Sequence, residues 1–399
     1  MSIPGAIDKR RLEIDHLRII GLGLLIIYHV LCVYAGGWRV ESSHAGHWGL
    51  LATAALYPWR MALIFFIGGV AARFLLEKQT LKAFAVDRTA RLLIPFAFAV
   101  LVLVPPQVYV RLDEMGQVRP GYLAWLLTDG FAQTLYHGVR LPVLAHAWFL
   151  PYLFAYCLTA ALAFAFARKA CAQAERRLEA APIGLVLGAL IGVFAVQSIL
   201  VEPWKPQNNY LFTDISAHLR YAPVFALGFL TARSQAFLDR QLKATNGLAL
   251  LAGLALPVSL GLQALALRHT PGVEMSLVRL AESVYGAGML LAIVGLARRA
   301  FKRPAPGLAY AADAIMPIYL LHQTVLIIAA DVIVPWRLPL YEEAPLLIAV
   351  TCLAPLTLYH LLIRRSAALR LVFGMRQERG SRLAPAPPAQ GQSPPARPA

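Results

Sequence analysis

The chain has 399 residues, of which 59% are hydrophobic and 15% are charged, and its formal net charge is +16. Soluble domains carry roughly 45–50% apolar and about 25% charged residues, so this composition excludes an ordinary soluble domain and indicates a surface covered by lipid. No nucleic-acid-binding motif accompanies the basic excess, so we attribute it to membrane topology and lipid headgroups, not to nucleic acid.

Ten apolar stretches follow one another along the chain, each near the roughly 20 residues that cross a bilayer. They lie near 17–36, 58–76, 92–110, 143–167, 182–201, 215–232, 246–267, 281–297, 314–334 and 345–363. The sequence therefore predicts an all-α polytopic membrane protein with about ten transmembrane helices. The stretch at 215–232 has the weakest signal, because His218 and Arg220 lie at its start.

Three divisions of the chain follow from this pattern. We expect a cytoplasmic N-terminal segment over 1–16, one transmembrane domain over 17–376, and a disordered basic and proline-rich tail over 377–399. A mixed segment, 121–137, is predicted to lie along the membrane interface, because its aromatic side chains suit that depth. Those side chains are Tyr122, Trp125 and Tyr136.

The distribution of lysine and arginine predicts the orientation. If the N-terminus is cytoplasmic, 25 of the 37 Lys and Arg residues fall in cytoplasmic segments, and the bias recurs in nearly every alternate loop. Ten spans return the chain to its starting side. Both termini are therefore predicted to be cytoplasmic, and the chain is predicted to cross the membrane many times.

The first predicted helix carries polar residues where lipid should exclude them. Asp15 and Arg18 are three residues apart and can pair. His29 lies eleven residues after Arg18, about 16 Å along the axis and on nearly the same helical face. A polar group at such depth suggests a functional site, although a structural histidine that bonds a neighbouring helix explains it equally well.

Arginines mark two further positions. Arg88 and Arg91 lie one turn apart at the cytoplasmic mouth of the third stretch, where two guanidinium groups can grip phosphate oxygens. Ordinary positive-inside charge is the simpler explanation of that pair taken alone. Arg60 lies at the opposite end of the second stretch, within an apolar run, where it could pair with a substrate carboxylate or extend toward the interface.

Two later helices add histidines. The fourth stretch begins with His146 and Trp148, and the ninth carries Tyr319 and His322. Each histidine alone suggests a structural role, but three membrane histidines at external or middle depth point together to chemistry. We predict no metal site, and the four scattered cysteines suggest neither a metal site nor a disulfide framework.

These motifs resemble the membrane acyltransferase-3 family, and within it the glucans biosynthesis protein C group. The likeness covers the chain from about residue 8 to about residue 375. The motifs are Arg18-x10-His29 in the first helix, Arg88-x-x-Arg91 before the third, His146-Ala-Trp148 at the fourth, and Tyr319-x-x-His322 in the ninth.

The resemblance implies an O-acyltransferase that moves an acyl group from a cytoplasmic acyl-CoA to a hydroxyl of a periplasmic or cell-envelope glycan or glycolipid. Group members are associated with succinylation, so succinyl-CoA or acetyl-CoA is the expected donor substrate, with no bound cofactor. By the same resemblance His29 is the base, with Arg18 and Asp15 on its face, and Arg88 and Arg91 bind the donor.

The remaining polar residues are substrate or oxyanion candidates, and no G-x-S-x-G motif points to a serine acyl-enzyme. They are His146, Trp148, Tyr319, His322 and Arg60. Two alternatives stay open at this point. One is a glycan or lipid exporter that uses the histidines as a proton relay. The other is a non-catalytic scaffold of a glycan-synthesis complex.

Overall fold

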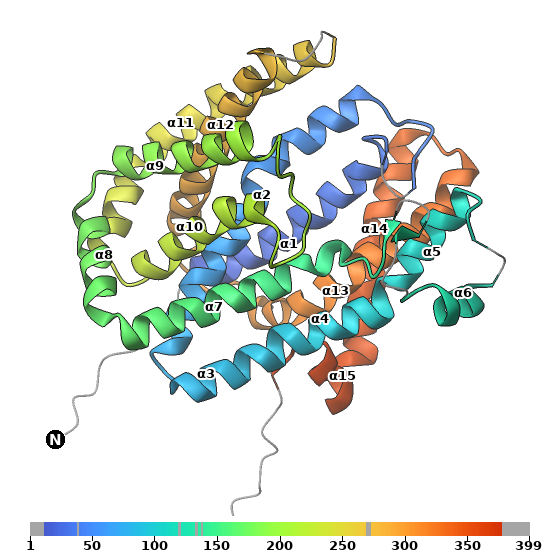
Figure 1. Ribbon diagram of the computed structural model, residues 1–399, viewed down its shortest axis with the longest axis horizontal. Coiled ribbons are helices and arrows are strands. Elements are labelled where there is room, and N and C mark those ends of the chain that lie inside the picture. The colour runs from blue at the N-terminus through green and yellow to red at the C-terminus, as the bar shows by residue number, and fades with distance from the viewer. Residues whose placement is uncertain are drawn as a thin grey trace, which may run out of the picture.

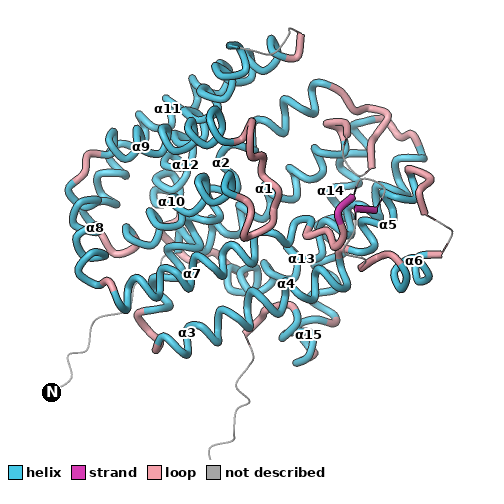
Figure 2. The backbone as a smooth tube through the Cα atoms, in the orientation of Figure 1, coloured by secondary structure: helices cyan, strands magenta, loops and turns pink. Residues whose placement is uncertain are grey.

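The protein is a bundle of long helices, shown in the computed structural model of Figure 1. The structure describes residues 12–37, 40–118, 121–131, 135–136, 139–268 and 273–376. The predicted tail over 377–399 therefore lies outside the described residues. Within them, the only strands form a two-stranded antiparallel hairpin, β1 (Leu135–Tyr136) and β2 (Val139–Arg140), drawn in magenta in Figure 2.

Helical segments follow one another along the whole chain. In order they are α1 (Leu12–Val33), α2 (His47–Leu76), α3 (Leu81–Arg88), η1 (Thr89–Leu93), α4 (Ile94–Phe98), η2 (Ala99–Leu103), α5 (Pro105–Glu114), α6 (Tyr122–Thr128), η3 (Ala145–Trp148), α7 (Phe149–Phe166), α8 (Arg168–Ala180), α9 (Ile183–Ala195), η4 (Val196–Val201), α10 (Ile215–Thr231), α11 (Gln235–Ala266), α12 (Val273–Ala300), α13 (Leu308–Ile333), η5 (Val334–Trp336), α14 (Leu340–Leu361), η6 (Ile363–Arg365) and α15 (Ala367–Val372).

Among the described residues, nine helices are long and apolar enough to cross a membrane, one fewer than the predicted ten. The helix that falls short is α10, in the stretch with the weakest signal. Its 17 residues span about 26 Å, less than the roughly 30 Å of a hydrocarbon core. The side chain of Asp214 caps its first turn by accepting a hydrogen bond from the Ala217 amide, which fixes where the helix begins.

Helix α10 nevertheless packs inside the bundle, because glycines let it approach α2 closely. A Cβ atom added to Gly228 would lie 2.2 Å from the carbonyl oxygen of Phe66, and one added to Gly69 would lie 2.1 Å from that of Phe225. Small residues at such crossings allow backbones to touch in membrane bundles. Glycine is therefore required on both sides of this contact.

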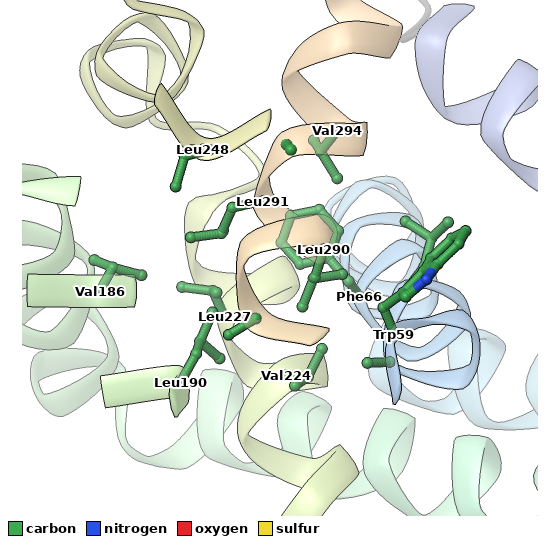
Figure 3. Packing of buried hydrophobic residues seen from close by; sticks show 14 of the residues in the cluster. Trp59, Phe66, Val186, Leu190, Val224, Leu227, Leu248, Leu290, Leu291 and Val294 are labelled. Atoms are coloured by element: carbon green, nitrogen blue, oxygen red, sulfur yellow. The ribbon is translucent and has the colours of Figure 1, made fainter. Parts of the chain in front are cut away.

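One core cluster fills the space between α2 and helices α9 to α12 (Figure 3). Trp59 and Phe66 enter it from α2, while Leu290 and Leu291 enter from α12. The Trp59 indole donates hydrogen bonds to the Tyr285 hydroxyl, at 3.0 Å, and to a backbone carbonyl of its own helix. This packing fixes the rotation of α2, and with it the direction in which the next residue, Arg60, points.

Ion pairs tie the bundle together at the end where the predicted cytoplasmic segments, rich in Lys and Arg, gather. We call this end, which includes Arg73 and Arg233, the basic end. Arg73 donates to Glu77 at 2.8 Å and to Glu175 of α8 at 2.6 Å, and Arg233 donates to Glu77 from beyond α10. Burial alone would raise the pKa of Glu77, but hydrogen bonds from Arg233 and Arg73 outweigh burial and lower this pKa. The network links α2, α8 and the end of α10.

The segment predicted to follow the interface packs onto α5 where the structure describes it. Helix α6 and residues near the hairpin form a small cluster with α5, and in it Trp125 is 4% exposed. The Trp125 side chain is therefore covered by protein. The sequence could not indicate this, because the neighbours that cover the ring come from other segments. The side chain of Tyr136 lies outside the described residues.

Candidate functional site

Two histidines that are 293 positions apart in the sequence meet in the bundle. Helices α1 and α13 pack against each other, and the distance from His29 Nδ1 to His322 Nε2 is 2.9 Å. The His322 side chain is fully buried, whereas His29 is only half-buried. A substrate can therefore reach His29 more readily than His322.

The surroundings of His322 determine which of its nitrogens carries hydrogen. Its Nδ1 lies 2.6 Å from the carbonyl oxygen of Tyr319, which can only accept, so Nδ1–H must donate. Nε2 of the neutral ring then accepts the hydrogen bond from Nδ1–H of His29. This arrangement leaves the lone pair of His29 on Nε2, which makes that nitrogen the basic one.

A third histidine reaches the same place from the turn before α7. The rings of His146 and His322 lie 5.2 Å apart, edge to face. His146 Nε2 donates to the carbonyl oxygen of Leu320 at 3.0 Å, while the Tyr319 hydroxyl donates to that of His146 at 2.6 Å. These reciprocal bonds join η3 to α13, and the structure thus gathers the candidate residues His29, His146, Tyr319 and His322.

Trp148 lies two residues after His146 and belongs to an aromatic group. Its ring is 5.3 Å from that of Tyr152, 5.7 Å from Tyr221 and 6.2 Å from Phe65. These rings connect α7 with α2 and α10. Trp148 is therefore part of a cluster of packed aromatic rings that begins two residues after His146.

Three buried polar residues beside His322 were not among the predicted site residues. Gln107 donates to the Thr324 hydroxyl at 2.7 Å, and Gln323 donates to Gln107 at 3.2 Å. The Thr324 hydroxyl in turn donates to the carbonyl oxygen of Leu103 at 2.7 Å. Leu103 ends the π-helical turn η2, a local widening that frees backbone carbonyls and often occurs at functional sites. The adjacent Pro105–Pro106 pair was the only sequence signal for this irregularity.

The structure separates Arg18 and Asp15 from the histidines. They form the predicted pair, with Arg18 Nη1 3.4 Å from Asp15 Oδ1, but this pair lies near the basic end of α1. The eleven-residue spacing places His29 about 16 Å further along the helix. The pair therefore belongs to the basic end of the bundle and lies far from the histidine contact.

Arg88 and Arg91 share a partner that sequence analysis did not select. Asp87 accepts hydrogen bonds from Arg88 Nε at 3.1 Å and from Arg91 Nε at 3.0 Å. Both guanidinium groups are partly buried, with side chains 15% and 26% exposed. The four-residue spacing of Asp87 and Arg91 was an available signal. A shared carboxylate holds the two arginines side by side.

Arg60 lies deeper than its sequence position suggested. Helix α2 begins at His47 and continues through Pro58, so Arg60 is 13 residues inside the helix and not at its end. The residues before the predicted start are themselves largely apolar and extend the helix. Arg60 is 5% exposed, and its guanidinium carbon lies 3.6 Å from the centre of the Tyr28 ring. It thus stands beside the residue that precedes His29.

Comparison with known proteins identifies the family of the chain. The family model described as "Acyltransferase domain", of the acyltransferase-3 type, matches residues 11–360. The chain is also 24% identical over 243 residues to glucans biosynthesis protein C from strains of Escherichia coli K12. That match covers 59% of this chain and about three fifths of the length of those relatives. No solved structure matches it significantly. Because the family model covers most of the chain, the protein belongs to the acyltransferase-3 family of acyltransferase domains.

Proposed function

We propose that this protein is an integral membrane O-acyltransferase of a bacterial inner membrane. It moves a succinyl or acetyl group from a cytoplasmic acyl-CoA to a hydroxyl of a cell-envelope glycan or glycolipid. Family membership supports acyl transfer, and the similarity to glucans biosynthesis protein C supports a glycan acceptor. The observation that carries the mechanism is the hydrogen bond between His29 and His322.

His29 acts as the general base in this proposal. Its Nε2 takes the proton of the acceptor hydroxyl as the hydroxyl oxygen bonds to the thioester carbon. The tetrahedral intermediate then collapses, the carbon–sulfur bond breaks, and the proton passes from His29 to the departing CoA sulfur. His322 holds the ring of His29 in the required tautomer, and the Tyr319 carbonyl holds His322.

The donor binds from the basic end. Arg88 and Arg91, held together by Asp87, contact its phosphates, because guanidinium groups suit phosphate oxygens. Along the helices, these arginines lie about 10–15 Å from the start of α3, whereas His29 lies about 26 Å from the start of α1. The long pantetheine arm of CoA bridges this difference in depth. Arg18 and Asp15 line the entrance along α1.

The topology completes the proposal. We infer ten spans, with the short α10 as the sixth, so that both termini are cytoplasmic and the basic end faces the cytoplasm. The half-buried side of His29 is then open to an acceptor that arrives from the other side of the membrane. Donor and acceptor meet at His29 from opposite directions.

Substitution of His29 tests the proposal. In a strain that lacks the gene, wild-type protein should add an acyl mass to envelope glycans, and mass spectrometry identifies both the acyl group and its carrier. His29→Gln keeps hydrogen bonding but cannot accept a proton at neutral pH, and His29→Ala removes the ring. Both should lower transfer about 10²–10⁴-fold while the protein remains folded in the membrane.

The same experiment separates the alternatives. Near-normal transfer by His29→Gln would contradict a base at this position. If glycans cross the membrane unmodified, the protein is an exporter. If both variants and His322→Leu all preserve the acylation phenotype, the protein is a scaffold and another enzyme performs the transfer.

A further inference from the structure

Arg60 places a charge deep inside the bundle. It lies about 20 Å from the start of α2 and about 24 Å from its end. Trp59, the preceding residue, faces the core cluster of Figure 3, so Arg60 points to a different side of α2. There its guanidinium stacks on the Tyr28 ring at 3.6 Å, next to His29 in the sequence. The Tyr28 ring in turn lies 5.5 Å from the ring of His29. Arg60 therefore belongs to the surroundings of the histidine pair.

The guanidinium of Arg60 lacks the partners that a buried cation needs. Its Nε and Nη1 atoms are buried and have no hydrogen-bond partner among the described residues. No carboxylate among the described residues lies within ion-pair distance of the Arg60 guanidinium, whose close contact is the ring of Tyr28. Stacking on one phenol ring is weak compensation for a desolvated charge.

Other buried arginines in the bundle have hydrogen-bond acceptors or ion-pair partners. Arg220 is 7% exposed and donates to Gln197 at 2.8 Å and to a backbone carbonyl at 2.7 Å. Arg73 is 8% exposed and forms two ion pairs, one of them with Glu77. The fold thus supplies acceptors for these two side chains but not for Arg60. We attribute the difference to a ligand that brings its own anion.

The chemistry of an acyl-CoA narrows the identity of that anion. Its phosphates lie beyond the pantetheine arm and belong at Arg88 and Arg91. Near the thioester, the anion that a donor can carry is a carboxylate at the far end of its acyl chain. We propose that Arg60 binds this terminal carboxylate and makes the site selective for dicarboxylic acyl groups such as succinyl. This inference rests on the proposed acyl transfer at His29.

Two donors of equal chain length test the inference. Succinyl-CoA ends in a carboxylate where butyryl-CoA ends in a methyl group. Equilibrium binding to the purified full-length protein, measured by calorimetry, needs no acceptor. Arg60→Gln should weaken succinyl-CoA binding at least about 30-fold, because a buried charge loses its partner, and should leave butyryl-CoA binding unchanged. Arg60→Lys should retain part of the preference for succinyl-CoA.

Controls separate recognition from folding. Without ligand, Arg60→Gln should unfold at the same or a higher temperature than wild type, since it removes an uncompensated charge. Arg220→Gln loses satisfied hydrogen bonds and should lower thermal stability without changing the ratio of the two donor affinities. A drop of equal size for both donors in Arg60→Gln, or equal wild-type affinities, would overturn the role of Arg60 while acyl transfer at His29 still stands. A wild-type protein that binds neither donor would contradict acyl-CoA use itself.

Discussion

Replacement of His322 by leucine should slow acyl transfer without abolishing it. The substitution places an apolar side chain of similar volume at a fully buried position. It removes the acceptor of His29 Nδ1–H at 2.9 Å and the donor to the Tyr319 carbonyl at 2.6 Å. His29 then loses the contact that selects its tautomer and orients its ring, but the basic nitrogen itself remains.

The size of the effect follows from those two contacts. A neutral hydrogen bond contributes about 0.5–1.5 kcal/mol, and a buried polar group that loses its partner costs about 1–3 kcal/mol. If the loss falls on the transition state, 1–3 kcal/mol corresponds to roughly 5- to 150-fold in rate. Most of that range lies below the roughly 10²–10⁴-fold expected when the base itself is removed. His322→Gln, whose side-chain oxygen can accept from His29, should recover part of the loss.

Acyl mass on envelope glycans, measured over time for each variant, gives the relative rates. Nitrogen NMR of labelled histidine reports the tautomer directly, and His29 should carry its hydrogen on Nδ1 only while His322 is present. His44→Gln is a matched control, because His44 also donates to a backbone carbonyl but lies in the loop after α1. If His322→Leu loses all activity while His29→Gln remains active, the base is His322 and the assignment is wrong.

Further predictions address the donor site, the basic end and the topology. Arg88→Ala and Arg91→Ala should raise the KM for acyl-CoA with little change in thermal stability, and an unchanged KM in the double variant would contradict donor binding. Because the folded-state pKa of Glu77 is lowered, its stabilising effect is complete above the ordinary value of 4.5, declines below that value, and is lost as pH falls through the folded-state pKa. The difference in melting temperature between wild type and Glu77→Gln should therefore shrink from pH 7 to below pH 4.5, and a constant difference would refute the assigned cause. Reporter fusions after Arg303 and after Met375 should both report cytoplasm, and one external signal would mean that the number of spans is wrong.

Much of the helical architecture could be predicted, because long apolar stretches of sequence identify membrane helices. The weakest predicted span, at 215–232, is also the helix that falls short of membrane length. Its place in the bundle depends on glycine contacts between α2 and α10. Such contacts join segments distant in the sequence, and no hydropathy pattern reveals them.

The candidate site was predictable as a set of residues but not as a geometry. Depth along each helix selected His29 and His322, yet nothing in the sequence states that their rings are 5.0 Å apart. The helical face shared by Arg18 and His29 suggested a common role, but the rise along α1 separates them. Pairing of Asp87 with Arg91 was open to prediction from local spacing, whereas the network of Gln107 required the fold.

Because of the π-helical turn η2, the direction in which the side chains after it point is sensitive to the loss of a single residue. A π turn holds one residue more than an α turn, so η2 acts as a single inserted residue in the helical run from α3 to α5, which also contains the π turn η1. Deleting one residue between Ala99 and Leu103 would restore α-helical phase and rotate everything after it by about 100°. Gln107 would then turn away from Thr324. A relative that lacks this inserted residue must form the polar contact to α13 from a different position. A one-residue gap in an alignment at η2 would therefore mean that the side chains after it face another direction.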